Sequence, residues 1–213
     1  MEYNKYNYIF PPRPDNAAPA TDIERYDNGS MLGQAKSNGS NCLIFTDGNT
    51  MHVMNRHNEL LTKFQISKEE VINNLFKCDV GKWMVLNGEY MNKSQNDENG
   101  KVFNHKLVLY DILVYNSVHL LGWSNDQRVN FMHELYGKNE SDKPYYYGIS
   151  ENIYMNITYY GEFAKLYNEM IKTDMIEGLV LKRRSAKLEP GRTEKNNNKS
   201  MVKFRKPTKN YKF

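Results

Sequence analysis

The stretch Gln34-Ala35-Lys36-Ser37-Asn38-Gly39-Ser40 is the centre around which the rest of the chain is organised. Lys36 stands three residues before Gly39, the flanking residues are small and polar, and the apolar run Cys42-Leu43-Ile44-Phe45 follows. A lysine near a glycine is weak evidence alone, because most lysines are solvated surface residues. The stretch becomes informative through later segments, which supply what a lysine nucleophile needs.

Length and composition narrow the class of protein. The 213 residues, of which 39% are hydrophobic, suffice for one domain or a tight pair of lobes, and we expect a single domain over 1–213. No run is long and apolar enough to span a bilayer, and the N-terminus lacks the apolar region of a signal peptide. Cys42 and Cys78 have no partner motif and are expected to be free thiols in a reducing compartment. The five histidines show no zinc-binding spacing.

Charge is distributed unevenly along the chain. Residues 181–213 hold twelve Lys or Arg and two Glu, a net charge of +10, whereas residues 1–180 hold 17 basic and 23 acidic residues, a net charge of −6. Such a basic C-terminal element fits either a solvated tail or a site for phosphates and a nucleic-acid backbone. Charge alone leaves both readings open.

Hydrophobic periodicity and turn residues predict an α+β fold with antiparallel strands broken by several helices. Residues 1–20 are proline-rich and predict an extended lead-in. Strands are expected before Lys36 and at 42–45, 51–54, 83–86, 106–114, 153–158, 177–182 and 201–206, with a hairpin turn at 46–49. Helices are expected from 21 to about 28, from 68 to about 77, from 125 to 136 and over 161–172, and loops at 92–101, 144–148 and 185–200.

A lysine that attacks a nucleotide phosphate has specific chemical needs. Its pKa must fall from about 10.4 so that a neutral amine is present, which burial and nearby cations achieve. The triphosphate needs cationic partners, the departing pyrophosphate needs a metal held by carboxylates, and the base needs an aromatic or apolar wall.

Residues of each required type lie on or beside the expected strands. Glu89 and Glu177 flank apolar strands next to a glycine, and Tyr110 is a strand aromatic that could stack on a base. Lys203 and Arg205 are two residues apart and so share one face of a strand, near Lys182 on the preceding strand. Singly, these residues also fit turn carboxylates, a core aromatic and a solvated strand face. Their order and spacing together favour a nucleotide site.

The series resembles the covalent nucleotidyltransferase superfamily of ATP-dependent DNA and RNA ligases and mRNA capping enzymes. The matching segments are Lys36-Ser37-Asn38-Gly39 (motif I), Leu86-Asn87-Gly88-Glu89-Tyr90 (motif III), Leu109-Tyr110-Asp111-Ile112-Leu113 (motif IIIa), Glu177-Gly178-Leu179-Val180-Leu181-Lys182 (motif IV) and Met201-Val202-Lys203-Phe204-Arg205 (motif V). The resemblance implies that Lys36 takes AMP, that Glu89 contacts the ribose, that Tyr110 stacks on adenine and that Glu177 serves the metal. It also implies that the basic residues of motif V grip the α-phosphate.

Some positions depart from the DNA-ligase pattern. Asn38 replaces an aspartate of motif I, and Asn41 stands where an arginine is usual. Gly39-Ser40-Asn41 instead resembles nick-sealing RNA ligases, which place a phosphate-binding arginine about twenty residues after the lysine, where Arg56 stands. Gln34 occupies the position of an adenine-reading glutamate of DNA ligases. Arg205 stands where RNA ligases usually carry a second lysine.

The resemblance therefore implies a small phage-type ATP-dependent polynucleotide ligase with a two-lobed adenylation fold and no OB domain. We expect it to join 5′-phosphate and 3′-hydroxyl ends through a lysyl-AMP intermediate, with RNA favoured as the substrate. Its implied partners are ATP, Mg²⁺ or Mn²⁺, and nucleic acid. We expect a monomer in the cytoplasm, that of the host if a phage encodes it. The alternatives are a DNA nick ligase and an inactive nucleotide- or nucleic-acid-binding module.

Overall fold

The computed structural model describes residues 1–191, 193 and 196–207. Its helices are the 3₁₀-helix η1 (Ala20–Tyr26) and the α-helices α1 (Lys68–Leu75), α2 (Asn125–Tyr136) and α3 (Phe163–Met170). Its strands are β1 (Arg13–Ala17), β2 (Met31–Ser37), β3 (Ser40–Thr46), β4 (Met51–Asn55), β5 (Met84–Met91), β6 (Lys106–Tyr115), β7 (Val118–His119), β8 (Tyr146–Gly148), β9 (Ile153–Asn156), β10 (Thr158–Tyr159), β11 (Ile176–Arg183) and β12 (Asn197–Arg205). None of these helices is long and apolar enough to cross a membrane.

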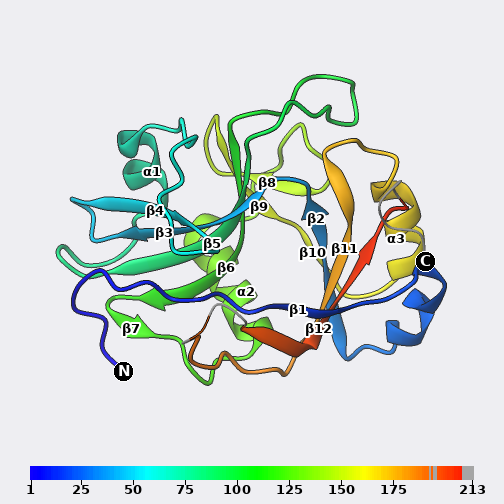
Figure 1. The fold of residues 1–213 in the computed structure, drawn as a ribbon, viewed down its shortest axis with the longest axis horizontal. Helices are drawn as coiled ribbons and strands as arrows, with labels where there is room; N and C mark the ends of the chain where they lie inside the picture. Colours follow the sequence, from blue (N-terminus) through cyan, green and yellow to red (C-terminus); the bar gives the residue numbers. More distant parts are fainter. Residues whose placement is uncertain (192, 194–195, 208–213) are drawn as a thin grey trace.

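The strands form two sheets (Figure 1). One buried core belongs to the larger sheet, and a second core joins the two sheets, since it contains Val108 of β6 as well as Leu179 of β11. The smaller sheet has the order β1-β12-β11-β2-β10, and the larger has the order β4-β3-β5-β6-β9-β8, with β7 added beside β6. Helix α3 packs against β11 of the smaller sheet, and helix α2 packs against β6 of the larger one. This confirms the predicted α+β architecture of sheets flanked by helices.

Among the strands of the described residues, two pairs run parallel, although the sequence predicts antiparallel strands. Strand β6 pairs in parallel with β9, and β1 pairs in parallel with β12. Alternation of side chains predicts a strand but not the direction of its partner, because both ladder types accept the same pattern. Strand β1 ends a segment that crosses from the larger sheet to the smaller one (Figure 1, dark blue), beginning where the Tyr3 amide donates to the Ser117 carbonyl.

Helices α1 and α2 begin where the sequence predicts, because their N-terminal serines form the expected capping hydrogen bonds. Ser124 and Gln127 form a reciprocal capping box at the start of α2, and Ser67 accepts a hydrogen bond from the Glu70 amide at the start of α1. The helix expected from Thr21 is instead a short 3₁₀-helix that follows Pro19 without a side-chain cap. Thr21 and Glu24 have the spacing of a capping box, but no capping box forms there, so the α-helix expected from 21 to about 28 is wrong.

Three further boundaries differ from the prediction. The tyrosine-rich segment expected as a loop contains strand β8, which pairs with β9. The strand expected over 153–158 is divided into β9 and β10, which belong to different sheets. Strand β12 begins at Asn197, inside the loop expected to reach Ser200. In each case the boundary is set by the partner strand rather than by local composition, so the composition does not reveal it.

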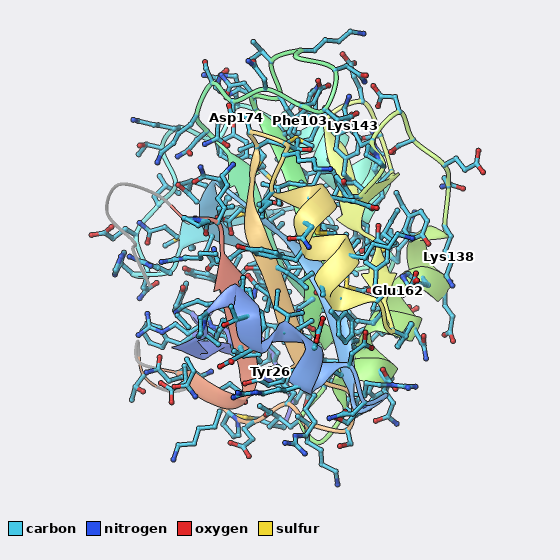
Figure 2. All side chains as sticks on the ribbon, turned by 90° about the vertical axis from the view of Figure 1, so that its right-hand side faces the viewer. Tyr26, Phe103, Lys138, Lys143, Glu162 and Asp174 are labelled. Carbon is cyan, nitrogen blue, oxygen red and sulfur yellow. The ribbon has the colours of Figure 1, made fainter. Side chains whose placement is uncertain are left out.

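A buried ion-pair cluster fixes the polar loop that follows β5. Lys143 Nζ donates to Asp97 Oδ2 at 2.6 Å and to Asp142 Oδ2 at 2.8 Å, and it lies 5.9 Å from the Phe103 ring centre. The Asn96 amide donates to Asp174 Oδ2 at 3.0 Å, just before β11. Figure 2 shows Phe103, Lys143 and Asp174 at one end of the molecule. The loop therefore supports the segment that enters β11.

Candidate active site

A cavity of about 780 Å³ lies between the two sheets. One wall comes from β2, β11 and β12, and the other comes from β3, β5 and β6, with residues 11–15 at the rim. The structure brings all nine predicted site residues to this cavity: Gln34, Lys36, Arg56, Glu89, Tyr110, Glu177, Lys182, Lys203 and Arg205. Residues from five strands and one loop thus converge on one space, which is typical of a ligand site.

Lys36 lies on β2 opposite Gly178 of β11, and its ammonium group contacts the Glu177 carboxylate. Burial lowers the pKa of Lys36 from 10.5 to about 8. Glu89 opposes this shift, whereas Arg205, Lys203 and Arg56 add to it. A pKa near 8 gives about 300-fold more neutral amine at neutral pH than a free lysine has. Lys36 therefore has the protonation behaviour that a nucleophilic amine requires.

Glu177 reaches the cavity through a β-bulge. Ile176 pairs with Ser37 and Gly178 with Lys36, so Glu177 is the extra residue between two consecutive register positions. A bulge redirects the side chain of the inserted residue. Gly178 has a φ of +150°, and a Cβ there would clash with the Phe204 carbonyl oxygen. Glycine at this position thus allows the bulge that aims Glu177 at Lys36.

We expect Gly178→Ala to lower the rate of any reaction at Lys36 by at least about tenfold and to destabilise the fold by about 2 kcal/mol, because the added methyl group forces the backbone of β11 away from β12. Gly100→Ala is the matched control, since Gly100 also has positive φ but has open space around its Cβ position. Urea unfolding and adduct kinetics measure the two effects. Equal behaviour of the two variants would contradict the role assigned to Gly178.

The smaller sheet presents a cluster of cations. Lys203 pairs with Val180 and Arg205 with Gly178, so both side chains lie on the cavity face. Arg205 Nε lies 3.8 Å from Glu177 Oε1, and Lys203 Nζ donates to the Pro14 carbonyl at 3.4 Å. Burial lowers the pKa of Lys203, and Arg205 and Arg13 lower it further. These positive charges repel one another, and an anionic ligand such as a phosphate would relieve that repulsion.

Glu89 lies on the opposite wall, on β5. Its Oε1 accepts a hydrogen bond from the Gly39 amide at 3.2 Å, which ties β5 to the turn after Lys36. Burial raises the pKa of Glu89 to about 7, although Lys36, the Gly39 amide and Arg56 act to lower it. A carboxyl group that titrates near neutral pH can accept or donate a hydrogen bond to a ligand hydroxyl.

Tyr110 occupies a second bulge. Gly88 pairs with Leu109 and Asn87 with Asp111, so Tyr110 is the inserted residue of β6. Asn41 Nδ2 contacts the Tyr110 hydroxyl, and Lys182 Nζ lies 5.1 Å from the ring centre and donates to the Tyr110 carbonyl at 3.3 Å. The ring is thus held at both ends, as a platform for a flat ligand must be. Lys182 lies at this end of the cavity, beside the predicted base-binding ring.

Lys182 is almost fully buried, and burial lowers its pKa to about 8, with Asp111 opposing and Arg128 adding to the shift. Behind it, Arg128 binds Asp111 through two hydrogen bonds of 2.7 and 3.0 Å. Burial alone would raise the pKa of Asp111, but the Arg128 guanidinium outweighs it and holds that pKa below its ordinary value. This buried pair fixes the strand segment next to Tyr110.

Arg56 follows β4 and lies at the outer rim, where its Nε donates to His57 Nε2 at 3.0 Å. It lies close enough to lower the pKa values of both Lys36 and Glu89. Arg56 is exposed, so it contributes positive charge at the entrance of the cavity.

Sequence reasoning missed two kinds of residue. Arg13 reaches the rim because β1 pairs with β12, and its Nε donates to Asn197 Oδ1 at 2.8 Å. Asn156 lines the deep end, at the last position of β9. For Arg13, the available signal was a basic residue within the proline-rich segment Pro11-Pro12-Arg13-Pro14. For Asn156, the available signal was a single asparagine in an apolar strand, since a buried amide needs hydrogen-bond partners.

A divalent metal fits the carboxylates of the cavity. Mg²⁺ binds through one or two carboxylates together with substrate phosphates, and needs no dedicated protein cage. Glu177 and Glu89 both line the cavity. Within the described part of the chain, no group of three or more His, Cys, Asp or Glu residues could hold a metal alone. The donor set therefore suits a metal that arrives with a phosphate ligand.

A family model matches more than half of the chain. The model of the ATP-dependent DNA ligase domain matches residues 92–205, which include the segments of Tyr110, Glu177, Lys182 and Lys203. The chain belongs to the ATP-dependent DNA ligase domain family. No curated protein matches its sequence. Membership in the family agrees with the resemblance inferred from the motifs.

Solved structures share the fold of this ligase domain at low identity. Mycobacterial DNA ligase D in complex with ATP is 16% identical, with a TM-score of 0.64 over 92% of this chain and 60% of the other. The ATP-dependent DNA ligase of bacteriophage T7 in complex with ATP is 14% identical, with a TM-score of 0.57 over 92% and 68%. The adenylated DNA ligase of Chlorella virus is 11% identical, with a TM-score of 0.54 over 92% and 68%. The chain thus spans about 60% of the mycobacterial ligase.

Proposed function

We propose that this chain is the adenylyltransferase domain of an ATP-dependent polynucleotide ligase, and that Lys36 is its nucleophile. In the first step, Lys36 Nζ attacks the α-phosphorus of ATP, the bond to the β-phosphate breaks, and pyrophosphate leaves. The amine loses a proton and a phosphoramidate to AMP remains. AMP then passes to a 5′-phosphate end, and a 3′-hydroxyl displaces it to form the phosphodiester.

The observation that carries this proposal is the surroundings of Lys36. A lysine with a pKa near 8 lies beside a carboxylate on one strand and two cations on the next. A solvated surface lysine would have neither the lowered pKa nor this cluster. The family match to ATP-dependent DNA ligases supports the same reaction.

The remaining site residues would contact different parts of the nucleotide, namely its phosphates, its ribose and its base. Lys203 and Arg205 would bind the α-phosphate and stabilise the charge that builds up on it. Arg56 would contact phosphate at the rim. Glu89 would bind a ribose hydroxyl, and Tyr110 would stack on the base while Lys182 holds the ring in place.

Glu177, with Glu89 nearby, would hold Mg²⁺. When bound, the ion supplies neutralisation of the negative charge on the departing pyrophosphate. Glu177 also contacts Lys36, so a metal ion bound to the Glu177 carboxylate would weaken the ion pair with Lys36 and favour the neutral amine.

We further propose that residues 1–213 form a single domain and act as a monomer. The free thiols of Cys42 and Cys78 suit a reducing cytoplasm.

Nick sealing tests the proposal and identifies the polymer. A duplex with a labelled 5′-phosphate at a single nick is incubated with ATP and Mg²⁺. Joining turns this phosphate into a phosphodiester, so the fraction of label that phosphatase cannot remove measures joining. The motif Gly39-Ser40-Asn41 and Arg56 predict the higher rate on an RNA nick. The family match to DNA ligases favours the second candidate, a DNA nick ligase, and a higher rate on an all-DNA nick would decide for it. Absence of joining on every nick would contradict end joining.

We expect the rate of adduct formation to depend on pH with a midpoint near pH 8. Only the neutral amine attacks, so the rate rises about tenfold per pH unit below the Lys36 pKa and levels off above it. Single-turnover labelling between pH 6 and 10 at saturating ATP and Mg²⁺ measures this profile. A midpoint near 10.4, the value of a free lysine, would show that the cavity does not activate Lys36.

A further inference from the structure

Residues 11–15 form part of the cavity rim, and Arg13 is the cation that this segment contributes. Arg13 is the first residue of β1 and lies opposite Asn197 of β12, in the parallel pair at the edge of the smaller sheet (Figure 1). Arg13 has no part in the reaction steps proposed above, although it lines the same cavity as Lys36.

The backbone around Arg13 is held in place on both sides. Pro12 and Pro14 flank it, and proline fixes its own φ at about −65°. The Arg13 amide donates to the Asn196 carbonyl at 3.1 Å, and the Pro14 carbonyl accepts a hydrogen bond from Lys203 Nζ at 3.4 Å. Arg13 is therefore fixed beside Lys203 without the help of a ligand.

The Arg13 side chain is bonded at one of its three nitrogens. Its Nε donates to Asn197 Oδ1 at 2.8 Å. Within the ranges that the structure describes, no acceptor is bonded to the two terminal nitrogens. A planar guanidinium that is oriented through Nε keeps these terminal nitrogens for a ligand, and their spacing matches two oxygens of a phosphate.

Arg13 extends the cation cluster of the smaller sheet to the rim. The strand order places β2 with Lys36 first, then β11, then β12 with Lys203, and then β1 with Arg13. Lys203 is a neighbour of both ends of this series. It lowers the pKa of Lys36, and its own pKa is lowered by burial, by Arg205 and by Arg13.

In-line displacement determines on which side of the α-phosphate the pyrophosphate lies. The attacking and leaving groups occupy opposite sides of the phosphorus atom. Lys36 attacks from β2, so the pyrophosphate extends away from β2, across β12 and toward β1. The departing group gains negative charge as the bond breaks, and cations placed there in advance stabilise that charge.

We propose that Arg13 binds the terminal phosphates of ATP through its two terminal nitrogens and holds pyrophosphate as it leaves. This assignment rests on the proposed adenylyltransferase function and adds a residue that acts on the leaving group. Asp15 also lines the rim and repels an anion there, so its charge opposes that of Arg13.

The reverse reaction tests pyrophosphate binding without any other ligand except the metal. Protein that carries AMP is freed of ATP and mixed with pyrophosphate and Mg²⁺. An oxygen of pyrophosphate attacks the phosphorus, the bond to Lys36 breaks, the amine takes up a proton, and ATP forms. The loss of AMP from the protein, followed by intact mass, gives the KM for pyrophosphate.

Arg13→Ala should raise the KM for pyrophosphate about ten- to hundredfold, because hydrogen bonds between charged groups are lost. It should lower kcat/KM for adduct formation from ATP by a similar factor. Arg13→Lys should recover part of the loss, since it restores the charge but not the paired donors. Asp15→Asn should act in the opposite direction and lower the KM for pyrophosphate.

Arg25→Ala is the matched control. Arg25 is an exposed arginine of η1 that pairs with Asp22 at 3.4 Å and does not line the cavity. We expect wild-type values of both constants for this variant.

A phosphate of the nucleic acid is another ligand with the same chemistry. Joining of a nick that already carries a 5′-adenylate uses the nucleic acid but no pyrophosphate, so Arg13→Ala should join this nick at the wild-type rate. Slow joining together with an unchanged KM for pyrophosphate would assign Arg13 to the nucleic-acid backbone and overturn the proposal.

A folded Arg13→Ala variant with wild-type constants for both pyrophosphate and ATP would also overturn the proposal. If Arg13→Ala does not fold, Arg13→Lys and Asp15→Asn carry the comparison, and wild-type constants in both would have the same consequence. A wild-type protein that forms no adduct with ATP would instead overturn the adenylyltransferase function, so the two failures are distinguishable.

Discussion

Lys36→Ala is expected to abolish the covalent protein–AMP adduct. The substitution removes the only atom that the proposed first step joins to the α-phosphate, and no hydroxyl or thiol takes its place. We expect labelling by ATP carrying a radioactive α-phosphate to fall below detection on a denaturing gel, a loss of at least about 10⁴-fold. Joining of a nick that already carries a 5′-adenylate should persist, because that step does not use the amine.

Lys165→Ala is the matched control for this variant. Lys165 is an exposed lysine on α3, so its loss should leave labelling unchanged. Lys36→Ala should also keep its fold, because Lys36 is partly exposed and forms part of the cavity wall rather than the core. Labelling of Lys36→Ala at the wild-type rate would remove Lys36 from the mechanism.

Glu177→Gln is expected to slow adduct formation by about 10²–10³-fold. The amide keeps the size of the side chain but loses the negative charge that would hold Mg²⁺. The same change removes the carboxylate that contacts Lys36, so the pKa of Lys36 should fall further. The variant should therefore combine a lower maximal rate with a pH midpoint below 8.

Glu169→Gln, at an exposed position of α3, provides the control, with wild-type rate and midpoint expected. Rates are measured by single-turnover labelling over a range of pH and Mg²⁺ concentration. A Glu177→Gln variant with a wild-type rate and an unchanged Mg²⁺ dependence would exclude Glu177 from metal binding.

Much of the fold follows from local sequence signals. Asp47-Gly48 between two apolar runs predicts the hairpin of β3 and β4, which the structure confirms. Ser124 and Gln127 predict the start of α2 through their capping chemistry. These signals work because the interacting atoms are only a few residues apart.

Features that depend on distant partners could not be predicted in this way. The bulges that project Tyr110 and Glu177 into the cavity arise from the register between paired strands. The parallel pairing of β6 with β9 brings Asn156 to the deep end, and β1 carries Arg13 to the rim. Side-chain alternation is the same for each of these pairings. The motifs therefore predict which residues line the cavity, but not the β-bulges that orient Tyr110 and Glu177 toward it.

The central claim is that Lys36 becomes covalently joined to AMP. Wild-type protein is incubated with ATP and Mg²⁺, digested under conditions that preserve phosphoramidates, and its peptides are weighed by mass spectrometry. We predict one added AMP, carried by the peptide that contains Lys36 and lost on treatment with acid. Folded protein without any AMP adduct, or with AMP on a different residue, would contradict the account.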